Sequence, residues 1–329
     1  MRRLALGTLI VNLAVILWGA VVRATGSGAG CGDDWPLCGG ELVPSAGSAE
    51  RWIEYTHRVT SGIALLLGAT LWWAARRSRP RGHPLRQASF LALLFLGVEA
   101  GLGALLVLYG WVAEDASTAR AWVMPLHLVN TLLLLAALTL AVHHASEARP
   151  VRLRGVRPHP LPTAGVFLLL LLAGATGALA ALAATLYPAQ SLAEGLAHDL
   201  AGGSPPFVRW RWLHLPVALV GAAALLWWLS WVAEEAPGIE PARTRSRARW
   251  AAWTLLFQLA VGGLTLATLA PLGLQLLHLL FADLLWIALV LTCASAWTPK
   301  ESERAVGSGR EPRRWSCLLG RGKPSIGGG

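Results

Sequence analysis

The chain has 329 residues, of which 55% are apolar and only 14% are charged, and its mean hydropathy is +0.52. A soluble domain carries about a quarter of charged residues, so this composition excludes an ordinary soluble protein. The formal net charge of +10 lies mostly in short segments between apolar runs. Such segments interact with anionic lipid, and a nucleic-acid partner is not needed to explain the charge.

Apolar runs of about 20 residues, the length that crosses the core of a bilayer, recur along the chain. The first run follows Arg2 and Arg3 and is longer than the apolar part of a typical signal peptide, so we interpret it as a membrane helix. We predict eight spans, at 4–22, 57–75, 88–109, 121–142, 162–186, 210–232, 250–270 and 274–297.

The distribution of Lys and Arg predicts the orientation of these spans. With a cytoplasmic N-terminus, the inner segments hold 22 of these residues and the outer segments hold six. This is the bias expected of a multi-pass protein, because cytoplasmic loops carry the excess of positive charge. We therefore predict a bacterial or archaeal plasma membrane, with both termini cytoplasmic and a disordered tail over 300–329.

The four cysteines differ in their surroundings. Cys293 lies in the last predicted span and Cys317 in the tail, and we assign neither a function. Cys31 and Cys38 share one outer loop, with the sequence CGDDWPLC. The outer side of a bacterial membrane is oxidising, so a disulfide across this loop is plausible, and two free thiols are the alternative.

The second half of the chain repeats the first. Spans two and six align around a histidine, and so do spans four and eight, while spans three and seven share a looser pattern, Glu99-x3-Gly103 against Gln258-x3-Gly262. Internal repeats indicate a duplicated architecture. We predict an all-α integral membrane protein whose eight transmembrane helices form two pseudo-symmetric four-helix bundles. The domains would be 1–148 and 158–299, joined by a cytoplasmic linker at 149–157.

Four histidines occupy matched places in this repeat. They lie near the predicted outer ends of the even-numbered spans: His57, His127, His214 and His278. Each lies within about six residues of its predicted helix start, so at 1.5 Å rise per residue the four depths agree within roughly 9 Å. Ionisable side chains are costly in a membrane and are usually functional there. We predict that these four histidines bind a cofactor near the outer face.

Haem is the cofactor that this pattern favours. Histidines that face each other in a four-helix bundle suit a pair of axial ligands, whereas zinc usually needs three or four close ligands. The repeat pairs His57 with His127 and His214 with His278, which gives one haem site per half. All four histidines would then bind haem iron.

The two halves also differ in ways that predict different roles. Three residues before His57 is Glu54, and three before His214 is Arg211. Positions i and i+3 share a helix face, so Glu54 should point toward whatever His57 binds. A rim carboxylate paired with Arg58 or Arg51 is the alternative. Only the first half has the cysteine loop, and we predict that this half performs the chemistry.

The motifs of the first half resemble those of the haem A synthase family in its bacterial form. They occur together and in order: Gly19-Ala20-x-Val22-Arg23, Cys31-x6-Cys38 with Trp35-Pro36-Leu37 inside it, and Glu54-x2-His57-Arg58. The resemblance extends from residue 1 to about residue 298. It implies an oxidoreductase that converts a methyl group of haem O to a formyl group by successive hydroxylations, giving haem A for terminal oxidases. Water is the expected oxygen source.

The resemblance also implies roles for individual residues. His57 and His127 would hold the substrate haem O, and His214 and His278 would hold a permanent haem b. Glu54 matches the essential acidic residue of the family. Cys31 and Cys38 match the loop cysteines that form a disulfide.

A mechanism follows from these roles. Glu54 would stabilise a cationic intermediate or accept the proton of the attacking water. The outer arginines Arg23, Arg58 and Arg120 could bind haem propionates, and interfacial positioning is the alternative for each. Glu99 and Asp283 are the remaining intramembrane acids, and either helix anchoring or proton passage would suit them.

Three rival functions remain open at this point. A di-haem cytochrome b electron carrier fits the four histidines equally well, a quinone-linked thiol oxidase would use Cys31 and Cys38, and a haem exporter would need exchangeable ligation. As partners we expect haem O synthase from the resemblance, membrane lipid and an unidentified electron acceptor. We expect no nucleic acid, and a homo-oligomer stays open.

Overall fold

The computed structural model describes residues 1–146, 160–235 and 240–298. The described residues are helical apart from loops and one isolated bridge between Cys38 and Glu41. The helices are α1 (Arg2–Ala24), α2 (Ala49–Ser78), α3 (Pro84–Leu108), α4 (Thr118–Ser146), α5 (Pro160–Leu186), α6 (Leu192–Leu200), α7 (Pro206–Arg209), α8 (His214–Glu235), α9 (Pro241–Ala267) and α10 (Leu272–Ala296), with short 3-10 turns η1 (Ser27–Ala29) and η2 (Arg211–Leu213).

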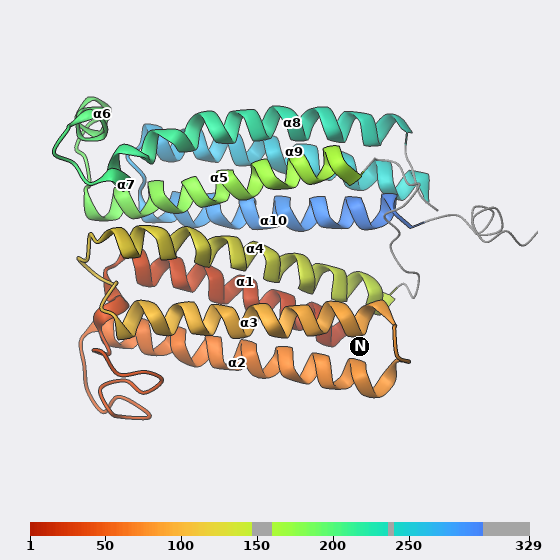
Figure 1. Ribbon diagram of the computed structural model, residues 1–329, viewed down its shortest axis with the longest axis horizontal. Helices are drawn as coiled ribbons and strands as arrows, with labels where there is room; N and C mark the ends of the chain where they lie inside the picture. Colours follow the sequence, from red (N-terminus) through yellow and green to blue (C-terminus); the bar gives the residue numbers. More distant parts are fainter. Residues whose placement is uncertain (147–159, 236–239, 299–329) are drawn as a thin grey trace, which may run out of the picture.

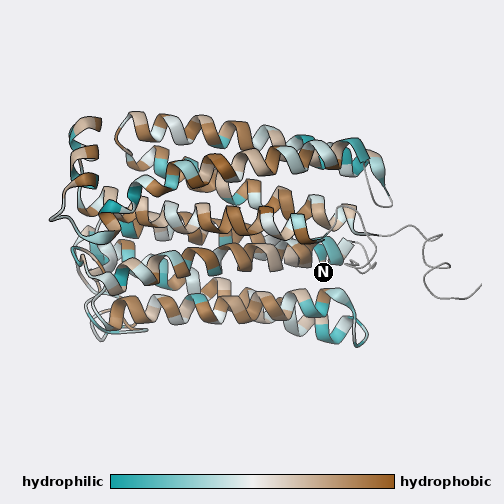
Figure 2. Ribbon diagram, turned by 45° about the horizontal axis from the view of Figure 1, so that its top comes forward, coloured by the Kyte–Doolittle hydropathy of each residue, from teal (hydrophilic) through white to brown (hydrophobic). Residues whose placement is uncertain are grey.

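Eight membrane spans are confirmed among the described residues. Eight helices are long and apolar enough to cross a bilayer, and α7, η2 and α8 together make one of them, over Pro206–Glu235. Figure 2 shows hydrophobic residues along the middle of these helices and hydrophilic residues toward their ends. The all-α membrane fold predicted from the sequence is therefore correct.

Helices α2, α3 and α4 begin several residues earlier than the apolar runs predict, and each has a polar side chain that caps its first turn. The hydroxyl of Ser48 accepts a hydrogen bond from the backbone N–H of Arg51 at 3.5 Å, and α2 begins at Ala49 rather than near residue 57. Such N-caps satisfy backbone groups that have no partner in the first turn. His57 thus lies in the third turn of α2 and His127 in the third turn of α4, whereas His214 is the first residue of α8.

The first four spans lie together, and so do the last four. Figure 1 shows α1 to α4 in the lower part of the view and α5, α8, α9 and α10 in the upper part. Helix α4 packs against both α5 and α10. Across this contact the indole N–H of Trp286 donates to the carbonyl of Leu132 at 2.7 Å.

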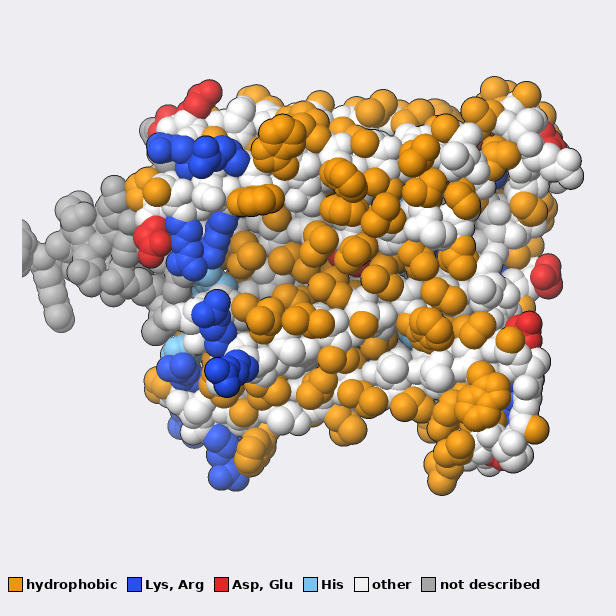
Figure 3. Space-filling view, turned by 180° about the vertical axis from the view of Figure 1, so that it is seen from behind, with side chains coloured by type: hydrophobic (Ala, Val, Ile, Leu, Met, Phe, Trp, Pro, Cys, Tyr) orange, Lys and Arg blue, Asp and Glu red, His pale blue; other side chains and the backbone are white. Residues whose placement is uncertain are grey.

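The division into two domains stays a prediction. Buried residues of α10, including Trp286 and Val290, belong to the same apolar core as residues of α1 to α4, so the halves share a packed interface. The predicted linker and tail, together with Cys317, lie outside the described residues. Figure 3 shows most Arg residues in view gathered at one end of the molecule, in line with the charge pattern, and the assignment of that end to the cytoplasm also stays a prediction.

Candidate functional site

The imidazole rings of His214 and His278 face each other across the second half. Their ring centroids are 6.4 Å apart and their planes are at 82°. The Nδ1 atom of His214 lies 3.1 Å from the carbonyl oxygen of Ala173. When Nδ1 carries the proton and donates it to that carbonyl, Nε2 is left as a free ligand atom. Backbone carbonyls often orient metal-binding histidines in this manner.

Glycines hold three of the four rings against neighbouring helices. A Cβ atom on Gly177 of α5 would lie 3.0 Å from Cε1 of His214, and one on Gly262 of α9 would lie 2.7 Å from Cε1 of His278. In the first half, a Cβ on Gly19 of α1 would lie 3.0 Å from Cε1 of His57. A side chain larger than hydrogen would displace each ring, so these glycines belong to the site.

The arrangement in the second half fits a metal held between two imidazoles. Bonds of about 2.0–2.1 Å from each imidazole nitrogen to a metal place the two ring centres roughly 6 Å apart, close to the observed spacing. The Nδ1 atoms of His278 and His57 are buried and have no hydrogen-bond partner within the chain. The residues present therefore fit the haem that the resemblance implies, and His214 and His278 would hold it.

In the first half, the imidazole of His127 is held by a carboxylate of α3. Nδ1 of His127 is in direct contact with Oε2 of Glu99. The other oxygen, Oε1, accepts hydrogen bonds from Asn130 at 2.8 Å and from Thr131 at 2.9 Å. His57 and His127 lie within electrostatic range of each other and of Glu99. The structure thus brings His57, His127 and Glu99 together.

The sequence leaves the role of Glu99 open, although the repeat points to it. The repeat aligns Glu99 with Gln258, whose Nε2 lies 3.4 Å from Nε2 of His278. In each half, therefore, a residue of the third span lies against the histidine of the span that follows: Glu99 contacts His127, and Gln258 lies near His278. The spacing alone could not show this, since the contact crosses between two helices.

Glu54 is buried and lies between α2 and the cysteine loop, with 3% of its surface exposed. Its Oε2 accepts a hydrogen bond from the backbone N–H of Cys31 at 2.7 Å. Its Oε1 accepts hydrogen bonds from Nε and Nη2 of Arg58, at 3.1 and 2.5 Å. Nη1 of Arg58 donates to the carbonyls of Asp34 and Leu37. The pair therefore fixes the loop to the helix that carries His57.

Arg211 makes a comparable connection in the second half. Its Nε donates to Oδ1 of Asp199 at 2.8 Å, and its Nη2 donates to the carbonyl of Gly195 at 2.9 Å. Asp199 and Gly195 belong to α6, in the outer loop. The residue three positions before the histidine thus ties the outer loop to the helix in both halves, with opposite charge.

The three arginines predicted to contact propionates already have partners in the protein. Arg23 donates to the carbonyl of Ala181 and to Oε1 of Gln275, both at 2.7 Å, and so joins the two halves. Arg120 is 3% exposed and donates through Nη1 to two loop carbonyls, while its Nε has no partner. Arg58 is bound by Glu54. Of the three, Arg120 retains a buried N–H available to an anion, and the propionate role stays a prediction.

Cys31 and Cys38 form the predicted disulfide. Both are almost completely buried, although they lie in an outer loop. Cys293 is a buried free thiol of α10. Asp283 is fully buried, and neither carboxylate oxygen has a hydrogen-bond partner.

Replacing both Cys31 and Cys38 with Ser should loosen the loop that Glu54 holds. A cross-link over so short a loop stabilises it by about 2.5 kcal/mol through the entropy of the open chain. We expect faster amide hydrogen exchange over residues 27–48, and no change at the second-half histidines. Cys293→Ala is the control for the loss of a thiol elsewhere. Unchanged exchange in the loop would contradict this prediction.

The sequence matches a family of known proteins over most of its length. The family is described as cytochrome oxidase assembly protein, and its model matches residues 2–290. The chain belongs to this family. As the sequence predicts, relatives named heme A synthase are among the proteins it resembles.

Several curated proteins are similar to this cytochrome oxidase assembly protein. A protein of Thermus thermophilus named protoheme IX farnesyltransferase is 41% identical over 98% of this chain and 54% of its own length. A heme A synthase of Exiguobacterium is 36% identical over 45% of this chain and 47% of its own length. A heme A synthase of Bacillus mycoides is 42% identical over 32% of this chain and 34% of its own length. The chain thus spans about half the length of the Thermus relative.

Proposed function

We propose that this protein is a haem A synthase, which oxidises a methyl group of haem O to the formyl group of haem A. The observation that carries the proposal is the pair of histidine sites at matched positions, of which the first has a disulfide loop and the carboxylate of Glu54 three residues before its histidine, where the second has Arg211. Two of the relatives are named heme A synthase, which supports the same activity.

His57 and His127 would hold the substrate haem O, and His214 and His278 would hold haem b. Bound at that second site, haem b supplies a one-electron redox centre. Glu99 holds Nδ1 of His127, and Ala173 holds Nδ1 of His214. The apolar spans around both sites exclude bulk water, which strengthens every charge–charge interaction inside them.

The chemistry needs an electron acceptor outside the chain. With water as the oxygen source, conversion of a methyl to a formyl group releases four electrons and four protons. Glu54 is the carboxylate next to the first site, and it is held by its ion pair with Arg58. It would stabilise positive charge that develops on the substrate or accept a proton from the attacking water.

A second candidate function comes from the Thermus relative, whose name describes transfer of a farnesyl group to protohaem IX. This chain matches about half of that protein, so the named activity can belong to the part that has no counterpart here. The relative also supports a partner: an enzyme that farnesylates protohaem and so makes haem O would supply the substrate.

The decisive experiment is mass analysis of the haems extracted from the purified protein, expressed in a host that makes haem O but no haem A. Haem A or a hydroxylated haem O beside haem b would support the synthase. Haem b alone, with haem O plentiful in the same membranes, would favour an electron carrier. Farnesylation of added protohaem, with no oxidised product, would favour the transferase.

A further inference from the structure

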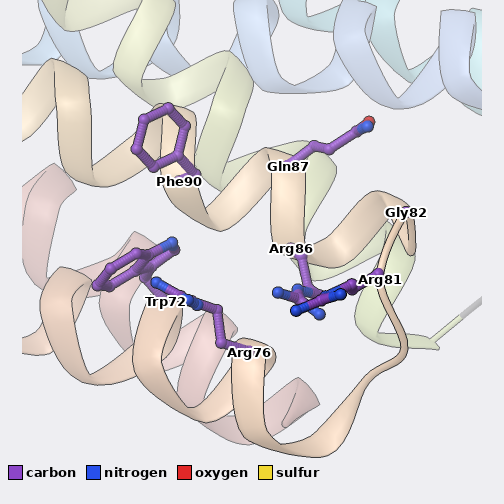
Figure 4. A pocket seen from close by; sticks show the side chains of 7 residues that line it. All are labelled: Trp72, Arg76, Arg81, Gly82, Arg86, Gln87 and Phe90. Carbon is purple, nitrogen blue, oxygen red and sulfur yellow. The ribbon is translucent and has the colours of Figure 1, made fainter.

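A shallow cavity of about 470 Å³, open at the surface, lies at the turn between α2 and α3, at the end of the bundle where Arg residues gather. Its lining includes three arginines, Arg76, Arg81 and Arg86, and two aromatic side chains, Trp72 and Phe90. In Figure 4, Arg81 and Arg86 point toward the same place, and Arg76 lies beside Trp72. The cavity is far from the histidine sites, which lie toward the opposite end of the spans.

The three arginines lack acidic partners in the part of the chain that the structure describes. The guanidinium of Arg76 lies 4.9 Å from the centre of the Trp72 ring. Arg86 makes one long hydrogen bond, of 3.4 Å, to the carbonyl of Arg79. No carboxylate of the described residues forms an ion pair with any of the three. Three positive charges around one cavity therefore favour an anion.

The aromatic side of the cavity indicates where that anion comes from. Phe90 is half exposed, and its ring centre lies 6.4 Å from that of Trp72, which also lines the cavity. Both lie on membrane-spanning helices near their polar ends, where exposed aromatic rings meet the lipid interface. A ligand with a phosphate at one end and acyl chains at the other would match the arginines and these rings together.

We propose that this cavity binds the phosphate group of an anionic phospholipid. Arg81 and Arg86 would form charge-assisted hydrogen bonds with the phosphate. Arg76, which lies beside Trp72, would add a third positive charge near it. Anionic lipid attracts basic segments at the cytoplasmic surface in general. This site differs because its arginines line one cavity.

The test uses the full chain in detergent, titrated with phosphatidylglycerol or phosphatidylcholine and followed by native mass spectrometry. We expect phosphatidylglycerol to bind at least about tenfold more tightly, and Arg81→Gln with Arg86→Gln to remove that preference. Arg77→Gln is the matched control, because its guanidinium lies 5.3 Å from the Trp73 ring and outside the cavity. An unchanged haem spectrum shows that each variant is folded.

Three results would overturn the proposal. The first is a double variant that binds phosphatidylglycerol as tightly as the unaltered chain does. The second is an equal loss of the preference in Arg77→Gln, which would indicate a general surface effect. The third is displacement of the lipid by inorganic phosphate at equal concentration, which would assign the cavity to a soluble phosphate compound instead.

A second inference rests on the contact between Glu99 and His127. The corresponding residue of the other half is Gln258, an uncharged amide whose Nε2 lies 3.4 Å from Nε2 of His278, while Nδ1 of His278 has no hydrogen-bond partner among the described residues. An anionic acceptor on one ring nitrogen makes the other nitrogen a stronger electron donor to a metal, and His278 has no such acceptor on Nδ1. The two histidine sites therefore differ in charge at one matched position.

We infer that Glu99 is a positioning residue that fixes the proton of His127 on Nδ1 and makes the first site more electron-rich than the second. This inference rests on the proposed function, because it requires iron at His127. A more electron-rich ligand favours the ferric state. The substrate would then lose electrons more readily than the resident haem at His278.

Glu99→Gln should raise the reduction potential of the first-half haem and leave that of the second half unchanged. A tenfold loss in the preference for ferric over ferrous iron corresponds to 59 mV for one electron. Spectroelectrochemistry of the purified protein measures both potentials.

The outcomes separate the two proposals. A first-half haem that binds with an unshifted potential in Glu99→Gln overturns the role of Glu99 and leaves the synthase proposal standing. Glu99 would then only anchor α3 to Asn130 and Thr131 of α4. Absence of haem from the first half of the unaltered protein overturns both.

Discussion

His57→Ala is expected to abolish conversion of haem O while the second-half haem stays in place. His57 is a proposed ligand of the substrate, and its ring packs against Gly19 of α1 in the same half. Changes in residues that merely support a metal ligand cost 10–100-fold. We therefore expect loss of a ligand itself to reduce turnover by about 100-fold or more. Product haems are measured by mass analysis and the remaining haem by its optical spectrum.

Two variants complete this experiment. His278→Ala should give the opposite pattern, with loss of the resident haem, because its ring faces His214. His198→Ala is the matched control: this outer-loop histidine of α6 is partly exposed and lies 4.0 Å from Glu194, and we expect no change. Loss of both haems in His57→Ala would contradict the assignment of His57 to the substrate site, since it would mean that His57 is needed for the stability of the whole fold.

The spans and the histidine positions could be predicted because both depend on local patterns. An apolar run of about 20 residues has few alternatives to a membrane helix, and a duplicated chain marks its matched residues by alignment. The loop disulfide was predictable for a similar reason, since Cys31 and Cys38 are close in sequence and on the oxidising side. Helix starts were predicted less well, because Ser48 and Ser117 cap polar turns that hydropathy does not detect.

Contacts between helices could not be read from one sequence. Glu99 and His127 are 28 positions apart, and Arg23 reaches Ala181 of the other half. Each of these contacts depends on how the spans pack against one another. The helical periodicity of a sequence shows which residues share a face of one helix, but it does not show which helix that face contacts. The partners of Glu54 illustrate the same point: the sequence offered Arg58 as an ion-pair partner, but the hydrogen bond from Cys31 depends on how the loop folds back onto α2.

The two halves use the same plan with different chemistry. In each, a residue three positions before the histidine ties an outer loop to the helix, through Glu54 in the first half and Arg211 in the second. The first loop is closed by a disulfide, whereas the second contains the short helix α6. Duplication of a four-helix unit would explain the fold, and under the proposed function the changes at these matched positions explain why one half would act on its haem.

Glu54→Gln is expected to reduce haem O conversion by about 100-fold while the second-half haem spectrum is retained. Removal of one oxyanion-stabilising group has effects of this size in enzymes. The same change also leaves Arg58 without its counter-charge. Because the Arg58 side chain is only 11% exposed, an unpaired charge there costs about 3–5 kcal/mol and could loosen the cysteine loop. The single variant therefore combines a chemical effect with a structural one.

The double variant Glu54→Gln with Arg58→Met separates these two effects. It removes the unpaired charge, and the amide oxygen of the introduced glutamine can still accept the N–H of Cys31. The hydrogen bonds from Arg58 to the carbonyls of Asp34 and Leu37 are lost in the double variant and in Arg58→Met alike, so the loop's hydrogen exchange is compared between these two. If Glu54 stabilises charge on the substrate, the double variant stays inactive although its loop exchanges no faster than that of Arg58→Met. Recovery of turnover in the double variant would mean that Glu54 serves only to neutralise Arg58. The cycle of both single variants and the double variant measures that coupling directly.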